Sequence, residues 1–248
     1  MATDIAVSVK SHVAVVEMHR PPANFFDEDL LRALADALLA LDEDSNVRSV
    51  VLCSEGKHFC AGAQLGDTTP EILRRVYRHA FALFTNRRPI VAAVQGAAVG
   101  GGLGLALAAD FRVATPGTRF TANFARLGFH HGFGLSVTLP AVVGRQRALE
   151  MLYTGRDVLG EEALTIGLAD RIAGDPRDAA FELAAEIAES APMSVTAIRA
   201  TMRREVVAAV SAALDEEAAA QTALLPTADF REGLDAARSR RTPTFMGT

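Results

Sequence analysis

Two short apolar segments, each followed by a glycine-containing loop, constrain the fold of this chain most. Ser49–Cys53 and Pro89–Val94 are continuous runs of mostly small and β-branched apolar residues. Such runs are typical of parallel strands that are buried on both faces. Helix-forming segments follow both loops, at Pro70–Asn86 and up to Ala109. Repeated strand–loop–helix units predict an α/β fold with a parallel sheet and right-handed crossovers.

The segments around these units extend the pattern. Val13–Met18 is a β-branched run that pairs with Ile5–Val9 through a short turn, and Phe111–Ala114 is a further strand. Asp27 is the expected N-cap of an amphipathic helix that ends at about Asp44. After Gly144 the composition is mostly helical, in Ala180–Glu189, Ser194–Leu224 and Asp229–Arg238. We therefore expect an α/β core over 1–190 and a helical lid or oligomerisation region over 191–248.

Composition narrows the class of protein. The 248 residues are 50% hydrophobic and 22% charged, which suits one globular domain with a small appendage. The net charge of -5 and the absence of Trp argue against nucleic-acid binding. Cys53 and Cys60 are too few for a disulfide framework and, with His58, too few for a structural zinc site. No targeting segment or uninterrupted stretch of about 20 apolar residues is present, which favours a cytoplasmic protein without a membrane span.

The two glycine loops are the best candidates for a functional site. Gly56–Leu65 follows the first buried strand, and Gly100–Gly104 follows the second. Ligands of open α/β folds bind beyond the carboxyl ends of the strands, where these loops lie. Backbone N–H groups from two such loops can point at one oxygen and form an oxyanion hole. Tight helix packing is the alternative explanation for the glycines, and the dinucleotide-binding fingerprint does not fit.

The loop sequences resemble signatures of the enoyl-CoA hydratase/isomerase (crotonase) superfamily. Phe59–Ala63 is similar to the family's F-C-A-G-A-D loop. Gln95–Gly102, followed by Ala109–Asp110, is similar to its second signature. Further likeness covers nearly the whole chain, at Pro22–Asn24, Tyr153–Gly155, Glu162–Ala163, Gly167–Leu168 and Asp229–Gly233.

The resemblance implies a crotonase-like spiral of ββα units and a homotrimer or homohexamer. It also implies an acyl-CoA thioester substrate, with no cofactor or metal beyond the coenzyme A of the substrate itself. By match, the backbone N–H groups of Ala63 and Gly101 are the oxyanion donors that stabilise a thioester enolate. Substrate contacts are implied at Ala23, Ala61, Gln64, Leu65, Gly100, Gly104 and Phe124.

Two positions depart from the family pattern. Family hydratases place one Glu two residues after the glycine triplet, where this chain has Gly104. They place a second Glu four residues before the glycine that corresponds to Gly128, and that position is Phe124. Hydration needs groups that move a proton between water and the substrate, and neither residue has one. The two-Glu hydratase and one-Glu isomerase mechanisms are therefore not expected.

Other residues are candidates to replace the missing carboxylates. His131 is the preferred proton carrier, because the pKa of histidine lies near neutrality, although a merely packed pair with His130 is the alternative. Tyr77 is a weaker candidate. Phe124 would favour a bulky or aromatic acyl group. Two further functions stay open: a CoA-ester-binding protein without activity, and a hydrolase or C–C lyase on the same scaffold.

The basic residues near the C-terminus have two possible roles. Arg238, Arg240 and Arg241 follow one another closely in the chain. One expectation is contact with the phosphates of coenzyme A, including those of coenzyme A bound to a neighbouring subunit. A solvated helix end is the alternative.

Overall fold

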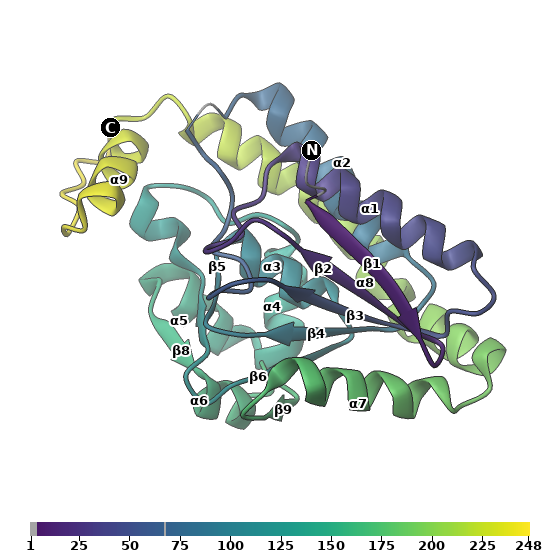
Figure 1. The fold of residues 1–248 in the computed structure, drawn as a ribbon. Coiled ribbons are helices and arrows are strands. Elements are labelled where there is room, and N and C mark those ends of the chain that lie inside the picture. Colours follow the sequence, from purple (N-terminus) through teal and green to yellow (C-terminus); the bar gives the residue numbers. More distant parts are fainter. Residues whose placement is uncertain (1–3, 67) are drawn as a thin grey trace.

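A computed structural model describes residues 4–66 and 68–248; residues 1–3, at the start of the expected α/β core, lie outside this part. Its main sheet has the strand order β1-β2-β3-β4-β6-β9 (Figure 1). The first two strands form an antiparallel hairpin, and every other neighbouring pair is parallel. The predicted α/β sheet is thus confirmed. The strands are β1 Ile5–Lys10, β2 Val13–Met18, β3 Ser49–Ser54, β4 Ile90–Val94, β6 Phe111–Ala114 and β9 Arg171–Ile172.

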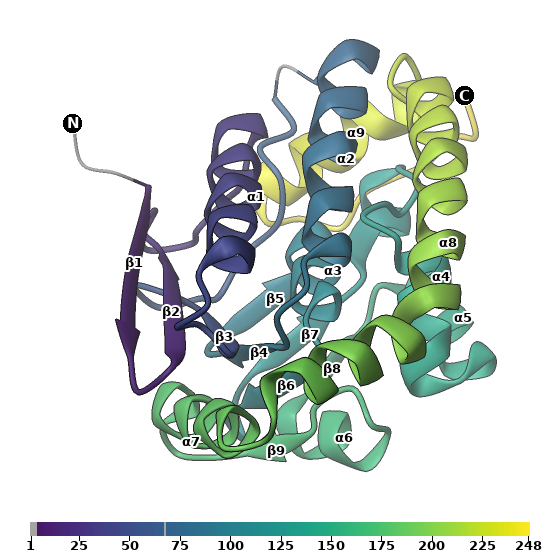
Figure 2. The ribbon, with the colours of Figure 1, turned by 90° about the vertical axis from the view of Figure 1, so that its right-hand side faces the viewer.

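Helices cover both faces of this sheet. Val50 and Leu52 of β3 belong to the core cluster shared with α1 (Glu28–Glu43) and α2 (Pro70–Thr85). The alternate residues Val51 and Cys53 pack against α7 (Pro176–Ala188) on the opposite face. Figure 2 shows α7 on one side of the strands and α1 and α2 on the other. Burial on both faces explains why the central strands are continuous apolar runs.

The two predicted helix starts are formed as expected. The Asp27 carboxylate accepts a hydrogen bond from the Leu30 N–H at 2.9 Å and caps α1. The Thr69 hydroxyl accepts from the Ile72 N–H at 3.3 Å, directly before Pro70 at the start of α2. These caps satisfy amides that have no partner inside the first helical turn.

A second, small sheet was not predicted from the sequence. It consists of β5 (Ala97–Val99), β7 (Arg119–Thr121) and β8 (Asp157–Leu159). Each strand has three residues, too few for an alternating pattern to stand out. An isolated bridge joins Cys60 to Ala98, next to this sheet. The bridge brings the loop after β3 beside the loop after β4.

The second half of the chain is mainly helical, as expected. Its helical elements besides α7 are η1 Asn123–Leu127 (a 3₁₀ helix), α4 Leu135–Val143, α5 Arg145–Thr154, α6 Gly160–Thr165, α8 Pro192–Leu224 and α9 Ala228–Ser239. Val210 and Leu214 of α8 belong to the main core. In contrast, α9 lies away from the sheet (Figure 1) and packs on the segment around η1, where Phe230 stacks on Phe129 at 4.4 Å. Within the described residues, no helix combines the length and apolarity needed to cross a bilayer.

Candidate active site

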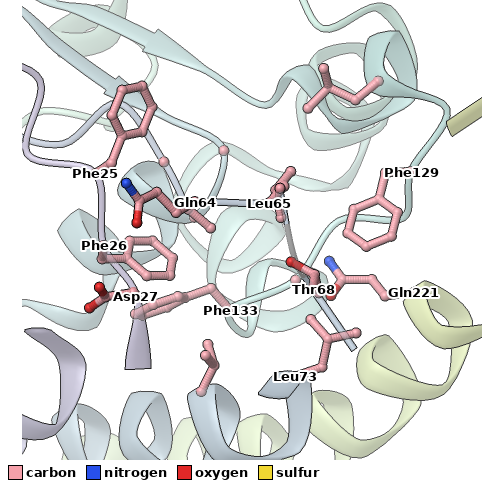
Figure 3. A pocket seen from close by; sticks show the side chains of 18 of the residues that line it. Phe25, Phe26, Asp27, Gln64, Leu65, Thr68, Leu73, Phe129, Phe133 and Gln221 are labelled. Atoms are coloured by element: carbon pink, nitrogen blue, oxygen red, sulfur yellow. The ribbon is translucent and has the colours of Figure 1, made fainter. Parts of the chain in front are cut away.

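A cavity of about 810 Å³ lies where the two glycine loops meet. Its lining is completed by residues 25–29, by α2, by η1 and the segment that follows it, and by residues of helices near the C-terminus, α8 and α9. Figure 3 shows Phe26 and Phe133 next to one another in this cavity, with Phe129 and Gln221 further along. Most of the side chains drawn there are apolar, so the cavity suits a largely apolar ligand with a few polar atoms.

The first loop exposes one backbone amide to the cavity. The Phe26 N–H donates to the Gly62 carbonyl at 3.0 Å, and the Gln64 N–H donates to the Phe26 carbonyl at 2.9 Å. Between these two bonds, the Ala63 amide donates to no residue in the described ranges 4–66 and 68–248. Gly62 has φ +113°, which favours glycine and turns the chain at this point. The Ala63 N–H is therefore available to a ligand.

The second loop exposes another amide at the start of a helix. Gly100 has φ +56°, and its N–H donates to the Thr121 carbonyl at 2.8 Å. Gly101 is the first residue of α3 (Gly101–Ala108), and among the described residues its amide has no acceptor. The next residue, Gly102, must lack a side chain, because a Cβ there would lie 2.2 Å from the Cys60 carbonyl oxygen. The glycine cluster thus combines close packing with a free helix N-terminus.

Backbone hydrogen bonds hold the two loops together. The Cys60 N–H donates to the Ala97 carbonyl at 3.1 Å, and the Val99 N–H donates to the Cys60 carbonyl at 3.0 Å. Ala63 and Gly101 consequently line the same cavity. The free amides of a helix N-terminus carry a partial positive charge. This arrangement can stabilise an oxygen atom on which negative charge develops.

The structure brings together most, but not all, of the substrate contacts implied by the sequence. The lining contains Ala61, Gln64, Leu65, Gly100 and Phe124. Ala23 is not part of it; its carbonyl accepts a hydrogen bond from the Ala61 N–H at 2.8 Å and so supports the loop from behind. Gly104 is also outside the lining, because Phe133 lies directly against it.

His131 lies beside the cavity rather than in its lining. Its Nε2 is 2.8 Å from the Ser136 hydroxyl, and its ring stacks on His130 at a centroid distance of 4.1 Å. Phe124 does line the cavity, and its ring packs edge-on against the His131 ring at a centroid distance of 6.4 Å. Burial, followed by electrostatic repulsion from the neighbouring His130, lowers the pKa of His131 to about 4. The His131 imidazole is therefore neutral at pH 7.

Three residues on α2 and α8 hold the segment 130–136 in place. The Tyr77 hydroxyl donates to Gln221 Oε1 at 2.6 Å, and Gln221 Nε2 donates to the His130 carbonyl at 2.8 Å. The Glu217 carboxylate accepts from the N–H groups of Gly134 and Ser136 at 2.8 and 2.9 Å. Burial and the Glu217 charge raise the pKa of Tyr77, which stays protonated.

Sequence reasoning missed two of these three residues. It identified Tyr77 as a weak candidate but did not select Gln221 and Glu217. Both lie in the C-terminal third of the long helix α8, more than 80 residues from the loop that they bind. No local pattern could have identified them. Their burial at 3% and 1%, unusual for residues of these types, becomes visible only in the structure.

Charged residues near the cavity are mostly paired. Asp27 contacts Arg20 at 2.7 Å; burial opposes ionisation of the carboxyl, but the Leu30 N–H and Arg20 outweigh it and lower the pKa of Asp27. Glu28 pairs with Arg75 at 2.7 Å. Of the three tail arginines, Arg238 lines the cavity.

Comparisons with known proteins agree with this architecture. A family model described as enoyl-CoA hydratase/isomerase matches residues 8–248. A Mycobacterium tuberculosis protein named probable enoyl-CoA hydratase EchA14 is 40% identical over 207 residues, which are 80% of this chain and 81% of that protein. A Bacillus subtilis protein named probable enoyl-CoA hydratase is 32% identical over 254 residues, 98% of each chain.

Solved structures show the same fold. An enoyl-CoA hydratase/isomerase from Pseudoalteromonas atlantica superposes with a TM-score of 0.90 at 31% identity, covering 98% of this chain and 100% of its own. An enoyl-CoA hydratase from Mycobacterium avium also superposes with a TM-score of 0.90, at 28% identity over 99% of this chain and 100% of its own. The expected crotonase-like fold is confirmed by these likenesses.

Proposed function

The chain belongs to the enoyl-CoA hydratase/isomerase family, and from this premise we propose that it binds acyl-CoA thioesters and polarises their carbonyl group. The observation that carries the proposal is the pair of free amides, Ala63 and Gly101, in the lining of one cavity. Relatives named enoyl-CoA hydratases support the same ligand class.

The proposed chemistry begins at the thioester oxygen. This oxygen accepts hydrogen bonds from the Ala63 and Gly101 N–H groups, and the bonds strengthen as the Cα proton leaves and an enolate forms. Each donor of this kind lowers a barrier by roughly 3 kcal/mol, because it is fixed in place before the charge develops. The first turn of α3 adds the favourable field of a helix N-terminus.

Proton transfer must use groups other than the usual pair of carboxylates. Gly104 and Phe124 offer no titratable atom, and the cavity's carboxylates come from residues 27–29. Asp27 among them already binds Arg20 and the first turn of α1. His131 stays our proposed proton carrier: it is neutral at pH 7, as a base must be, and it lies next to the Phe124 ring. Because His131 is outside the lining, we propose that it reaches the substrate after the Phe124 side chain moves aside. Replacing His131 by Ala tests this role, and unchanged turnover in the variant would contradict it.

The remaining expectations concern binding and assembly. Arg238, at 66% side-chain exposure, can contact a coenzyme A phosphate while α9 stays docked. We propose a homotrimer or homohexamer, with coenzyme A present only as part of the substrate and the protein in the cytoplasm. Light scattering at micromolar concentration tests the assembly, and a monomer would contradict it.

Binding and turnover are tested separately. Calorimetry with a panel of acyl-CoA thioesters measures affinity, and mass spectrometry of the same mixtures measures product. We expect binding of several thioesters and turnover of at least one. Absence of heat and of competition across the panel would overturn the proposal. Binding without any turnover would instead favour the CoA-ester-binding protein without activity, and release of free CoA or of a shortened acyl product would favour the hydrolase or C–C lyase.

A further inference from the structure

Phe133 has an unusual backbone conformation for its residue type. Its φ is +64°, in the left-handed region that non-glycine residues seldom adopt. The side chain is 1% exposed and lines the cavity. Its ring packs edge-on against Phe26 at 5.5 Å and at a tilt against Phe84 at 6.5 Å (Figure 3 shows the Phe26 contact). Such a conformation persists only where the surroundings enforce it, which points to a function for the ring.

The Phe133 side chain occupies the place where a side chain at position 104 would begin. A Cβ on Gly104 would lie 2.5 Å from the Phe133 Cβ and 2.8 Å from its Cγ. A Cβ on Gly101, the residue that carries one free amide, would lie 3.8 Å from the Phe133 ring. The ring therefore lies beside Gly101, one of the two proposed oxyanion donors, in the space that a side chain at position 104 would occupy.

The flanking residues fix this ring from both sides. Gly132 packs so closely on α2 that a Cβ there would lie 1.8 Å from the Tyr77 hydroxyl oxygen. On the other side, the Gly134 N–H donates to the Glu217 carboxylate. Since both anchors are buried, the segment cannot move aside to admit a side chain at position 104 at low cost.

We propose that Phe133 determines the specificity of the acyl pocket. Its ring replaces a side chain at position 104 and, with Phe26 and Phe124, forms an apolar wall beside the oxyanion donors. The wall excludes water from the acyl carbons next to the thioester, and it accepts apolar acyl groups while rejecting those with a hydroxyl at these carbons. A hydroxyl against the rings would lose its hydrogen bonds to water without a replacement. The ligand class rests on the proposed acyl-CoA function; the steric exchange between positions 104 and 133 does not.

A double-mutant cycle tests the steric exchange without any ligand. Gly104→Ala and Phe133→Gly are each expected to lower the urea midpoint of unfolding, the first by collision and the second by leaving a cavity. Glycine accepts the φ of position 133 and leaves room for the new Cβ, so the double variant should lose much less stability than the sum of the two. Combining Gly104→Ala with Phe230→Leu, a buried ring on α9, should be additive. Additive losses in the 104/133 pair would overturn the exchange.

A pair of thioesters tests the specificity. In calorimetry, the wild-type protein should bind butanoyl-CoA with a dissociation constant at least about 10-fold lower than that for 3-hydroxybutanoyl-CoA. This is the ratio expected when a buried hydroxyl has no hydrogen-bond partner. Phe133→Gly should reduce this ratio several-fold, whereas Phe120→Leu, a buried ring outside the lining, should preserve it. An unchanged ratio in Phe133→Gly, or equal wild-type affinities, would overturn the specificity claim.

The outcomes separate this inference from the proposed function. If neither thioester binds, the acyl-CoA function fails and the specificity claim fails with it, while the unfolding cycle still decides the exchange. Where Phe133→Gly does not fold, Phe133→Leu takes its place: the shorter side chain should raise the affinity for a branched acyl-CoA relative to butanoyl-CoA. No change in that relative affinity would contradict the proposal.

Discussion

The two halves of the cavity wall differ in what supplies their chemistry. On one side, the loops 60–66 and 96–102 present backbone amides, and their geometry depends on glycines and main-chain hydrogen bonds. On the other side, the rings of Phe124 and of Phe133, which lies against Gly104, take the place of the two carboxylates of family hydratases. The backbone half matches the family, and the side-chain half departs from it.

This difference indicates that the catalytic side chains can change while the backbone donors of the proposed site are kept. An amide belongs to the main chain, so every substitution except one to proline leaves it in place, whereas a catalytic side chain is lost through almost any substitution. Polarisation of the carbonyl is therefore expected to persist in this chain, and proton transfer is expected to differ. The predictions below test each half separately.

The largest expected effect concerns crotonyl-CoA hydration. A relative with both carboxylates, assayed alongside, should hydrate this substrate roughly 10⁴-fold faster or more, because each general acid or base contributes about 10²–10⁴-fold. Absorbance at the enoyl-thioester band measures the rate. A hydration rate near that of the relative would contradict the difference between the two halves, since the aromatic half would then transfer protons as well as a pair of carboxylates does.

The backbone half is tested by removing one donor. Ala63→Pro deletes an N–H that makes no hydrogen bond within the described residues, so no internal hydrogen bond of the loop loses its donor. Turnover of the substrate found in the panel should fall by roughly 10²–10³-fold, as for other oxyanion-hole donors. Ala63→Gly keeps the N–H and is the matched control. Equal loss in both variants would show that packing, and not the donor, matters at this position.

The support of the aromatic half is tested through α8. Glu217→Ala leaves the amides of Gly134 and Ser136 without their acceptor and should destabilise the fold by about 1–3 kcal/mol. Glu216→Ala, at an exposed position one residue earlier, should stay within about 0.5 kcal/mol of wild type. Urea unfolding measures both. Similar midpoints for the two variants would mean that Glu217 does not support the segment.

The smallest effect is a pH dependence. The pKa of His131 is lowered to about 4 in the folded protein, so between this value and the ordinary value near 6.5 the unfolded chain binds more protons. The contribution of the neutral His131 imidazole to the free energy of unfolding is therefore full above pH 6.5, and it is lost as the pH falls toward 4. His131→Asn should therefore reduce the drop in melting temperature between pH 7 and pH 5. An identical drop in variant and wild type would contradict the burial assigned to this imidazole.

Much of the fold could be predicted because its elements carry local signals. The central strands are apolar on both faces, and Asp27 and Pro70 mark helix starts with residues that are chemically suited to these positions. The small second sheet gave no such signal, because its strands of three residues depend on pairing with distant segments. The bridge that brings Cys60 to Ala98 belongs to the same category of long-range contact.

The candidate site also has one part that local sequence motifs indicate and one part that depends on long-range contacts. The two glycine loops are contiguous motifs, and both line the cavity, as expected from the residues that form them; their role as oxyanion donors stays a prediction. The wall opposite them is assembled from α2, α8 and the segment after η1, and its key contacts join residues 81 to 144 positions apart. The positive φ of Phe133, on which the contact with Gly104 depends, has no sequence signal, because phenylalanine is not a residue that favours this conformation.

The central claim is that the Ala63 and Gly101 amides polarise a bound thioester carbonyl. Isotope-edited infrared spectroscopy tests it directly, with a butanoyl-CoA labelled with ¹³C at the carbonyl carbon. Bound to the wild-type protein, the carbonyl band should shift to lower frequency than in water, and the shift should shrink in Ala63→Pro but not in Ala63→Gly. A band at its solution frequency in the wild-type complex, or a shift that Ala63→Pro leaves unchanged, would contradict the account.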